Sequence, residues 1–570
     1  MKPLLVLTAI ALLAAPASRG DTLPRVLERA ILPIRVQAPL WGRFETAIVN
    51  PRPYANPYRD VSLDAVFTRP DGGTVRFWGF YDGGQTWRMR FMPDQPGEWR
   101  YEARFSDGPP AAQGAFLCVP SDLPGMIAPD ESNPAWFGYR GGDAVLVRGL
   151  HVGDRFFARN WDDPANPADG ERRSAFLDWA QRQGYNLLSV ASHYLNRNSA
   201  GRGRGWNTPK LWPLSAAEYQ SMEAVLDDLA SRRILAYPFA GFFGRSSSYP
   251  DNPADQALYL RYTYARLGAY WNLLLNVAGP EPLLPNNAYL TRDQVNRLGS
   301  DIQRLNVFAK PISIHNPTGN DLFLDEPWLT YGTLQGPKTV DRAALAAILL
   351  RNHHPRKPLL AQETLWSGNI NHIRSIRRDY TDDDLRKNAI VIHFSAASLV
   401  FADNDGDSSS GYSGTMDPKD CRQNRHDAVR LAWDLCAALP FAHLQPCPGA
   451  VSGRHAFCLA DPGREYLIYL ERTAPVIVTL EGGPYEATWT NARQPSGLEA
   501  GGAVRTGQVL EPPSHGDDWI LRLRRSAELR IPTQFGQRSD LIRTAIQSIS
   551  DTDPIQFGQR SEGYSDSFSA

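Results

Sequence analysis

The sequence predicts a multidomain chain: a central (β/α)8 TIM barrel, an N-terminal antiparallel β-sandwich before it, and a smaller C-terminal β-sandwich after it. Apolar residues alternate with period two near both ends of the chain, as half-buried strands require. Between these regions, eight strand-like segments alternate with helix-like ones, which is the pattern of βα units. A chain of 570 residues also exceeds what one hydrophobic core organises, so several domains are expected.

The two ends of the chain carry non-domain segments. Lys2, the apolar run that follows it and the small-residue site ending at Ala17 are typical of a secretory signal peptide. The last 39 residues are polar and repeat one hexapeptide, which predicts a disordered tail. We therefore expect an exported protein, periplasmic or extracellular, that leaves the membrane once the leader is removed. The expected boundaries are 1–17 for the leader, 25–120 for the first β-sandwich, 128–445 for the barrel, 446–531 for the second β-sandwich and 532–570 for the tail.

Alternation predicts the two flanking domains. Trp87, Met89 and Phe91 alternate with arginines, and Trp519 begins a similar stretch near the C-terminus. The barrel follows from its order of elements. Strands are expected at 145–147, 186–190, 234–239, 271–277, 311–315, 329–334, 358–362 and 397–402, and helices at 172–183, 216–233, 256–268, 291–305, 342–352 and 382–394.

An open doubly wound sheet is the alternative to a closed barrel. Such a sheet would be expected to carry a nucleotide-binding fingerprint, and neither G-x-G-x-x-G after the first strand nor a Walker A sequence occurs. We therefore favour the barrel and expect no cofactor.

Composition excludes some classes of partner. The 60 basic and 61 acidic residues give no net field for nucleic acid or an anionic membrane.

The five cysteines include no C-x-x-C pair, so no metal site is expected. Cys447 with Cys458 is the best candidate for a disulfide. Composition does not indicate an oligomeric state.

Two glutamates follow predicted barrel strands. Glu281 comes just past the fourth strand and Glu363 just past the seventh, and active sites of such barrels lie at the carboxyl ends of the strands. Cleavage of a glycosidic bond needs two carboxyl groups on either side of that bond. Either residue could instead cap a helix or pair with an arginine, but the two positions together favour catalysis.

These residues carry a resemblance to a known family. Glutamates after strands four and seven resemble the clan A retaining glycoside hydrolases, and several stretches are more similar still to apiosidase-like (β/α)8 glycosidases. The matching stretches are 261–270 with 279–281, 311–316, 357–363, 78–84 with 97–101, and 485–489 with 518–521. Together they span nearly all of the chain except the leader and the tail.

The resemblance implies roles for the two glutamates. Glu281 would be the acid/base and Glu363 the nucleophile, with retention of configuration and carboxyl groups about 5 to 5.5 Å apart. The chain departs from the pattern at Pro280, where many members have asparagine. The substrate is then an oligosaccharide or polysaccharide of plant, algal or microbial origin.

Other residues near strand ends are candidates for substrate contacts, although each histidine could satisfy a backbone group and each aromatic could pack a loop. The candidates are His193, Tyr194, Phe243, His315, Asn316, Gln335 and Trp366. Arg148 and His151, placed at the end of the first strand, could bind an anionic sugar or neutralise Glu363, and an ion pair is the more conservative interpretation for Arg148.

The acidic loop 403–407 is also expected to face the substrate, with Asp403 as a contact. It departs from the calcium-binding helix–loop–helix pattern because Ser408 stands where that pattern needs glycine.

Two other functions stay open at this point. The chain could be a non-catalytic carbohydrate- or matrix-binding protein, since barrels host many functions. It could also be a polysaccharide lyase built on Arg148, His193 and Tyr194.

Overall fold

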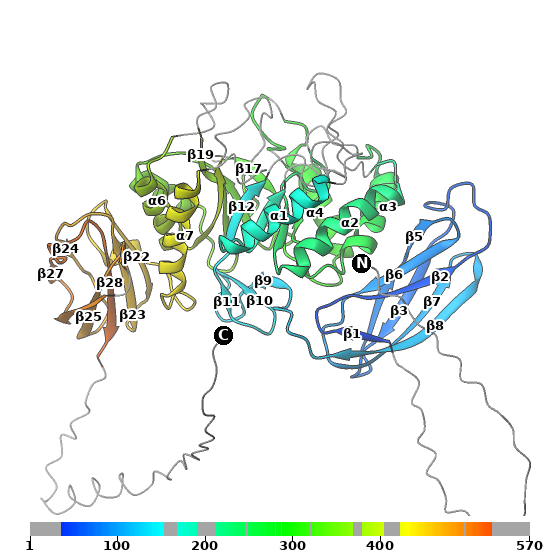
Figure 1. Ribbon diagram of the computed structural model, residues 1–570, viewed down its shortest axis with the longest axis horizontal. Helices are drawn as coiled ribbons and strands as arrows, with labels where there is room; N and C mark the ends of the chain where they lie inside the picture. The colour runs from blue at the N-terminus through cyan, green and yellow to red at the C-terminus, as the bar shows by residue number, and fades with distance from the viewer. Residues whose placement is uncertain are drawn as a thin grey trace, which may run out of the picture.

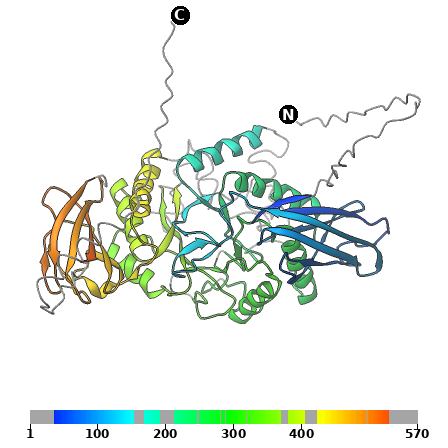
Figure 2. The same cartoon turned by 90° about the horizontal axis from the view of Figure 1, so that it is seen from below.

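The computed structural model describes most of the chain between the predicted leader and the tail. The described residues are 36–152, 168–190, 212–244, 249–279, 281–286, 288–317, 319, 321–368, 379–403, 422–494 and 497–526. The predicted leader, the predicted tail, His193 and Tyr194 lie outside them. Figure 1 shows a central region of helices around strands, with a group of strands at each end, and Figure 2 shows the same order from below.

The N-terminal domain contains two sheets that pack against each other. The larger has the order β1-β8-β7-β3-β4 and the smaller the order β2-β6-β5. Rings of opposite sheets stack between them: Phe44 with Phe116, and Phe67 with Phe91, each pair with centroids 4.0 Å apart. The strands are β1 Gln37–Pro39, β2 Phe44–Val49, β3 Leu63–Thr68, β4 Thr74–Trp78, β5 Phe80–Gly83, β6 Thr86–Phe91, β7 Gly97–Phe105 and β8 Gly108–Val119.

A small sheet beneath the barrel was not predicted (Figure 1). It consists of β9 Ile127–Pro129, β10 Phe137–Tyr139 and β11 Ala144–Val145. The predicted first barrel strand, 145–147, is therefore wrong. Val145 ends β11, and the first strand of the barrel sheet is β12, Arg148–Val152.

The central sheet is parallel and has the order β14-β13-β12-β20-β19-β18-β17. Its strands are β12, β13 Leu187–Val190, β14 Leu235–Pro238, β17 His315–Pro317, β18 Gly332–Gln335, β19 Leu359–Ser367 and β20 Ala397–Asp403.

A separate parallel pair, β15 Leu275–Asn276 with β16 Ile312–Ser313, lies between the two edges of this sheet. Leu274 N–H donates to Ala236 O on β14 at 3.0 Å, and Thr330 N–H donates to Ile312 O at 2.9 Å. These bonds join the pair to β14 at one edge of the sheet and to the segment before β18 near the other, an arrangement consistent with a TIM-like domain.

Helices lie between successive strands and cover the outside of the sheet (Figure 1). Those described are α1 Ala168–Arg182, α2 Ala216–Ser231, α3 Pro253–Leu267, α4 Arg292–Leu305, α5 Arg342–Arg351, α6 Asp382–Phe394 and α7 Gln423–Ala437. Thr291 and Thr381 begin α4 and α6 with capping boxes, which satisfy backbone N–H groups that have no acceptor within the helix. Helix α7 was not predicted. No described helix is both long and apolar enough to cross a membrane.

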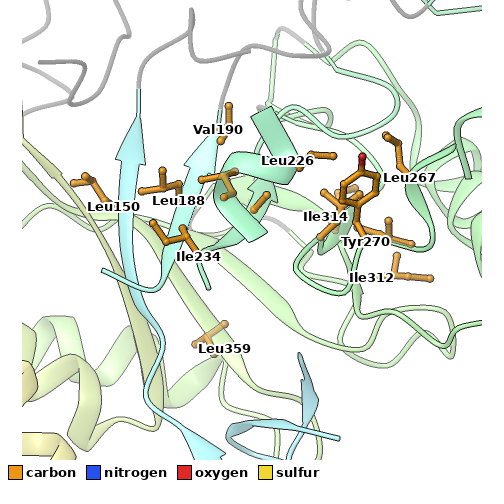
Figure 3. Packing of buried hydrophobic residues seen from close by; sticks show 14 of the residues in the cluster. Leu150, Leu188, Val190, Leu226, Ile234, Leu267, Tyr270, Ile312, Ile314 and Leu359 are labelled. Carbon is orange, nitrogen blue, oxygen red and sulfur yellow. The ribbon is translucent and has the colours of Figure 1, made fainter. Parts of the chain in front are cut away.

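Apolar side chains of neighbouring strands and helices form one large core. Figure 3 shows Leu150 of β12, Leu188 and Val190 of β13 and Leu226 of α2 within it. Such packing fixes the strands relative to one another, and so fixes the backbone from which the site residues project.

A buried ionic cluster joins the N-terminal domain to the barrel. Glu223 of α2 forms ion pairs with Arg90 of β6 at 2.7 Å and with Arg266 of α3 at 2.6 Å. Arg266 also contacts Asp82 of β5 at 2.9 Å. The side chains of these four residues are at most 8% exposed, so each charge depends on its partners rather than on water.

The C-terminal domain has its own core and two sheets, of orders β21-β22-β23-β28-β25-β26 and β24-β27. Arg386 of α6 forms two hydrogen bonds to the buried Asp518, at 2.8 and 3.0 Å, which attach this domain to the barrel. Its strands are β21 Gln445–Pro446, β22 Ala456–Asp461, β23 Glu465–Leu470, β24 Val476–Ile477, β25 Tyr485–Asn491, β26 Leu498–Val504, β27 Val509–Leu510 and β28 Trp519–Arg525.

The suggested disulfide is absent from the structure, which describes both Cys447 and Cys458 as free thiols. The two residues are nevertheless neighbours. Cys447 N–H donates to Cys458 O at 2.9 Å, beside the pairing of β21 with β22.

Candidate active site

Glu363 lies inside a strand rather than after one. Strand β19 continues to Ser367, and its register with β20 shifts between Gln362 and Leu365, so Glu363 and Thr364 form a bulge. The expectation that the seventh strand ends at Gln362 is corrected accordingly. Glu363 has φ +53 and is 4% exposed. A left-handed backbone is costly for a residue with a side chain, and such strain clusters at functional sites.

Two neighbouring strands hold the Glu363 carboxylate. Gln335, the last residue of β18, donates from Nε2 to Glu363 Oε2 at 2.7 Å. His315 Nε2, from β17, lies 3.5 Å from the same oxygen. The carboxylate oxygen Oε2 of Glu363 therefore faces polar side chains from both β17 and β18.

Glu281 lies beyond β15 and also has a left-handed backbone, with φ +52. Its N–H donates to the carbonyl of His315 at 3.0 Å. His315 thus contacts both candidate glutamates: its carbonyl accepts from the Glu281 backbone, and its ring approaches the Glu363 side chain. Eight described residues other than glycine have positive φ, and both glutamates are among them.

His315 is neutral in this environment. Complete burial, together with the nearby His151 and Lys338, holds the pKa of His315 well below its usual range. Apart from the approach to Glu363, neither ring nitrogen has a hydrogen-bonding partner among the described residues. Buried polar atoms are usually paired, so this ring is suited to bind a hydroxyl group or water that enters the site.

His151 connects the first strand to the seventh. Its Nδ1 lies 3.0 Å from Gln362 Nε2 and 3.3 Å from Ser189 Oγ. The ring of Trp366 lies with its centroid 5.4 Å from that of His151. Phe239 lies between the two histidines, with centroids 5.2 Å from His151 and 4.1 Å from His315.

The structure thus brings together the expected residues His151, His315, Gln335, Glu363 and Trp366, with the Glu281 backbone beside them. Three side chains that the sequence did not single out belong to the same group. Ser189 and Gln362 lie within strands rather than after their ends, and Phe239 directly follows β14. Polar and aromatic residues predicted to point from the strands into the barrel interior would have included these three.

Arg148 does not lie with these residues, and its placement at a strand's carboxyl end is wrong. It begins β12, so it stands at the opposite end of the strand from Val152. Its Nη1 donates to Asp434 Oδ1 of α7 at 2.7 Å. It therefore joins β12 to a helix and does not neutralise Glu363. The lyase hypothesis loses one of its three proposed residues as a result.

Three further candidates have contacts of a structural kind. Asp403, fully buried, accepts from Arg425 of α7 at 2.8 Å and lies 3.2 Å from His426, so it joins β20 to α7. Phe243 packs against Tyr249 and Tyr259. Asn316 donates to Asp321 O at 2.8 Å and so holds the following loop.

The described residues contain no cluster of three His, Cys, Asp or Glu side chains that could hold a metal ion. Residues 404–407 of the acidic loop lie outside the described part of the chain.

Comparisons with known proteins agree with this geometry at the level of fold. A family model described as a domain of unknown function, DUF5060, matches residues 37–106. A provisionally assigned glycoside hydrolase from Bacteroides vulgatus shares 16% identity over 86% of this chain and 100% of its own, with a TM-score of 0.66. A family 5 glycoside hydrolase from the same organism shares 15% identity over 74% and 98%, with a TM-score of 0.51.

No curated protein matches this chain. At such low identities the likeness shows a shared fold. It supports a fold like that of these glycoside hydrolases and does not single out the apiosidase-like family.

Proposed function

We propose that this chain is an exported glycoside hydrolase that cleaves a glycosidic bond of a plant, algal or microbial polysaccharide by a retaining mechanism. Glu363 is the nucleophile and Glu281 the acid/base. The observation that carries the proposal is the double contact of His315, whose carbonyl binds the Glu281 backbone and whose ring faces Glu363. We also propose that the two flanking domains are β-sandwiches. The narrower resemblance to apiosidase-like glycosidases is part of the same proposal.

The two glutamates would act in two steps. In the first, an oxygen of Glu363 attacks the anomeric carbon while Glu281 gives its proton to the departing glycosidic oxygen, so a glycosyl ester forms as the glycosidic bond breaks. In the second, Glu281 takes a proton from water, whose oxygen attacks the anomeric carbon and releases the Glu363 carboxylate. Two displacements at one carbon retain its configuration.

The surroundings of Glu363 fit the role of an ionised nucleophile. The amide N–H of Gln335 stabilises negative charge on Oε2. The neutral ring of His315 leaves that charge unneutralised, so the carboxylate stays available to a positive anomeric centre. Glu281 is less buried, as an acid/base that must meet both the leaving group and water requires.

A panel of plant, algal and microbial polysaccharides tests the activity, with release of reducing sugar as the measurement. NMR of the first product then reports the anomer. We expect the configuration of the substrate to be retained. Inversion would contradict the nucleophilic role of Glu363, and a product with a carbon–carbon double bond would indicate a lyase instead.

Gln335 offers a more selective test. Gln335→Met removes the donor to Glu363 Oε2 while keeping the length of the side chain. Loss of a hydrogen bond to a charged group costs about 1.5 to 3 kcal/mol, so kcat should fall about 10- to 100-fold with little change in Tm. Gln335→Glu should be at least as harmful, since it sets a second carboxylate beside the first. Unchanged kcat in both variants would remove Gln335 from the mechanism.

A further inference from the structure

The loop after β18 carries a lysine beside the proposed site. Gln335 at its start contacts Glu363. The carbonyl of Gly336 accepts from Thr364 Oγ1 at 3.2 Å, and the carbonyl of Thr339 accepts from Asn388 Nδ2 at 2.7 Å. Lys338 lies between these two anchored residues, so its backbone is held beside the bulge that carries Glu363.

The positive charge of Lys338 also acts on the site. The residue is half-buried, and it is one of the groups that lower the pKa of His315, whose ring faces Glu363. The ammonium group therefore acts on the residue that contacts both glutamates.

Lysine is rare in this chain, so the partners of each described lysine can be compared with those of Lys338. Seven of the 60 basic residues are lysines, and the ion pairs between described residues are formed mostly by arginine. The other described lysines have protein partners. Lys310 donates to the carbonyls of Tyr270 and Leu273, Lys357 donates to those of Leu324 and Glu326, and Lys387 pairs with Asp383.

For Lys338 the structure gives no hydrogen bond or carboxylate partner among the described residues. A half-buried lysine without a protein partner can form a charge-assisted contact with an anionic group of a ligand.

We propose that Lys338 binds an anionic substituent, a carboxylate or a sulfate ester, on the sugar that occupies the site. This inference rests on the proposed function and names its substrate class as a polysaccharide of acidic sugars. An anionic ring seated beside Glu363 would otherwise meet two carboxylates, and the lysine offsets that repulsion. A carboxylate and a sulfate ester offer the same charged oxygens, so the probes must separate them.

Binding to the full chain tests the inference without requiring turnover. The probes are glucuronate and galacturonate, glucose 6-sulfate and galactose 6-sulfate, and the neutral parents glucose and galactose, titrated while tryptophan fluorescence is followed. We expect at least one charged sugar to bind about 10-fold more tightly than its neutral parent, the effect of one charge-assisted contact. Preference for uronates identifies a carboxylate, and preference for sulfated sugars identifies a sulfate ester.

Variants assign the preference to the lysine. Lys338→Met should abolish the difference between charged and neutral sugars and leave the affinity for neutral sugars unchanged, whereas Lys338→Arg should keep it. Lys387→Met, which removes a lysine on α6 that pairs with Asp383, is the matched control and should behave as the parent. Equal affinity for charged and neutral sugars in the parent, or an undiminished difference in Lys338→Met, would overturn the inference.

These outcomes separate the inference from the proposed function. Hydrolysis of neutral polysaccharides without any preference for charge would refute the role of Lys338 and leave the hydrolase intact. Preference for charged sugars without hydrolysis of any polysaccharide would support the role of Lys338 and contradict the proposed hydrolase activity.

Discussion

Glu363→Gln is expected to lower kcat by roughly 10⁴-fold or more, because an amide oxygen cannot form the glycosyl ester that a carboxylate forms. In energy this corresponds to about 5 kcal/mol of transition-state stabilisation. The fold should be unaffected, since glutamine has the same shape and its carbonyl oxygen still accepts from Gln335. Rates on the best polysaccharide of the panel provide the measurement, and Glu131→Gln, which changes an exposed glutamate, is the control.

The companion variant Glu281→Gln separates the two roles. A leaving group that departs without a proton, such as nitrophenolate, should restore the first step in this variant and not in Glu363→Gln. Azide added to the alanine variants gives a second readout. With Glu281→Ala it should yield a glycosyl azide of retained configuration, and with Glu363→Ala one of inverted configuration. Full activity in either glutamine variant would remove that residue from the mechanism.

Glu223→Gln is expected to lower the free energy of unfolding by about 3 to 5 kcal/mol, the usual cost of removing one member of a buried ionic group. Arg90 and Arg266 would then lose the carboxylate they share at the junction of β6, α2 and α3, and would keep only Glu45 and Asp82, respectively, as partners. Urea denaturation followed by circular dichroism measures the change.

The same helix provides a control for this prediction. Asp227, one turn after Glu223 on α2, also pairs with the N-terminal domain, through Arg43 at 2.9 Å. Those two side chains are 52% and 27% exposed, so Asp227→Asn should cost at most about 1 kcal/mol. A loss of stability no larger in Glu223→Gln than in Asp227→Asn would mean that the buried cluster contributes little.

Local sequence patterns predicted six of the seven α-helices in the described part of the chain. The predicted ranges 342–352 and 382–394 match α5 and α6 closely, because Asp341 and Thr381 cap those helices with their own side chains. Such capping depends on residues three positions apart, which a sequence displays directly.

The strand ends were harder to predict. Strand β19 is buried along its whole length, so no alternation marks the bulge at Glu363 or the true end at Ser367. Similarly, nothing local distinguishes the short strand β11 from β12, and Arg148 was assigned to the wrong end of a strand as a result. The contacts of His151 with Gln362 and Ser189 join three strands distant in the sequence, and they became visible only in the folded chain.

The attachment of Glu281 to a main-chain oxygen has an evolutionary consequence. Any residue at position 315 supplies that same carbonyl, so a mutation there can alter how the site treats a ligand while the Glu281 backbone keeps its anchor. The position of the Glu281 backbone thus depends on a main-chain contact and not on the side chain at position 315. Descendants of this chain are free to change the chemistry of the sugar they accept without rebuilding the pair that would cleave it.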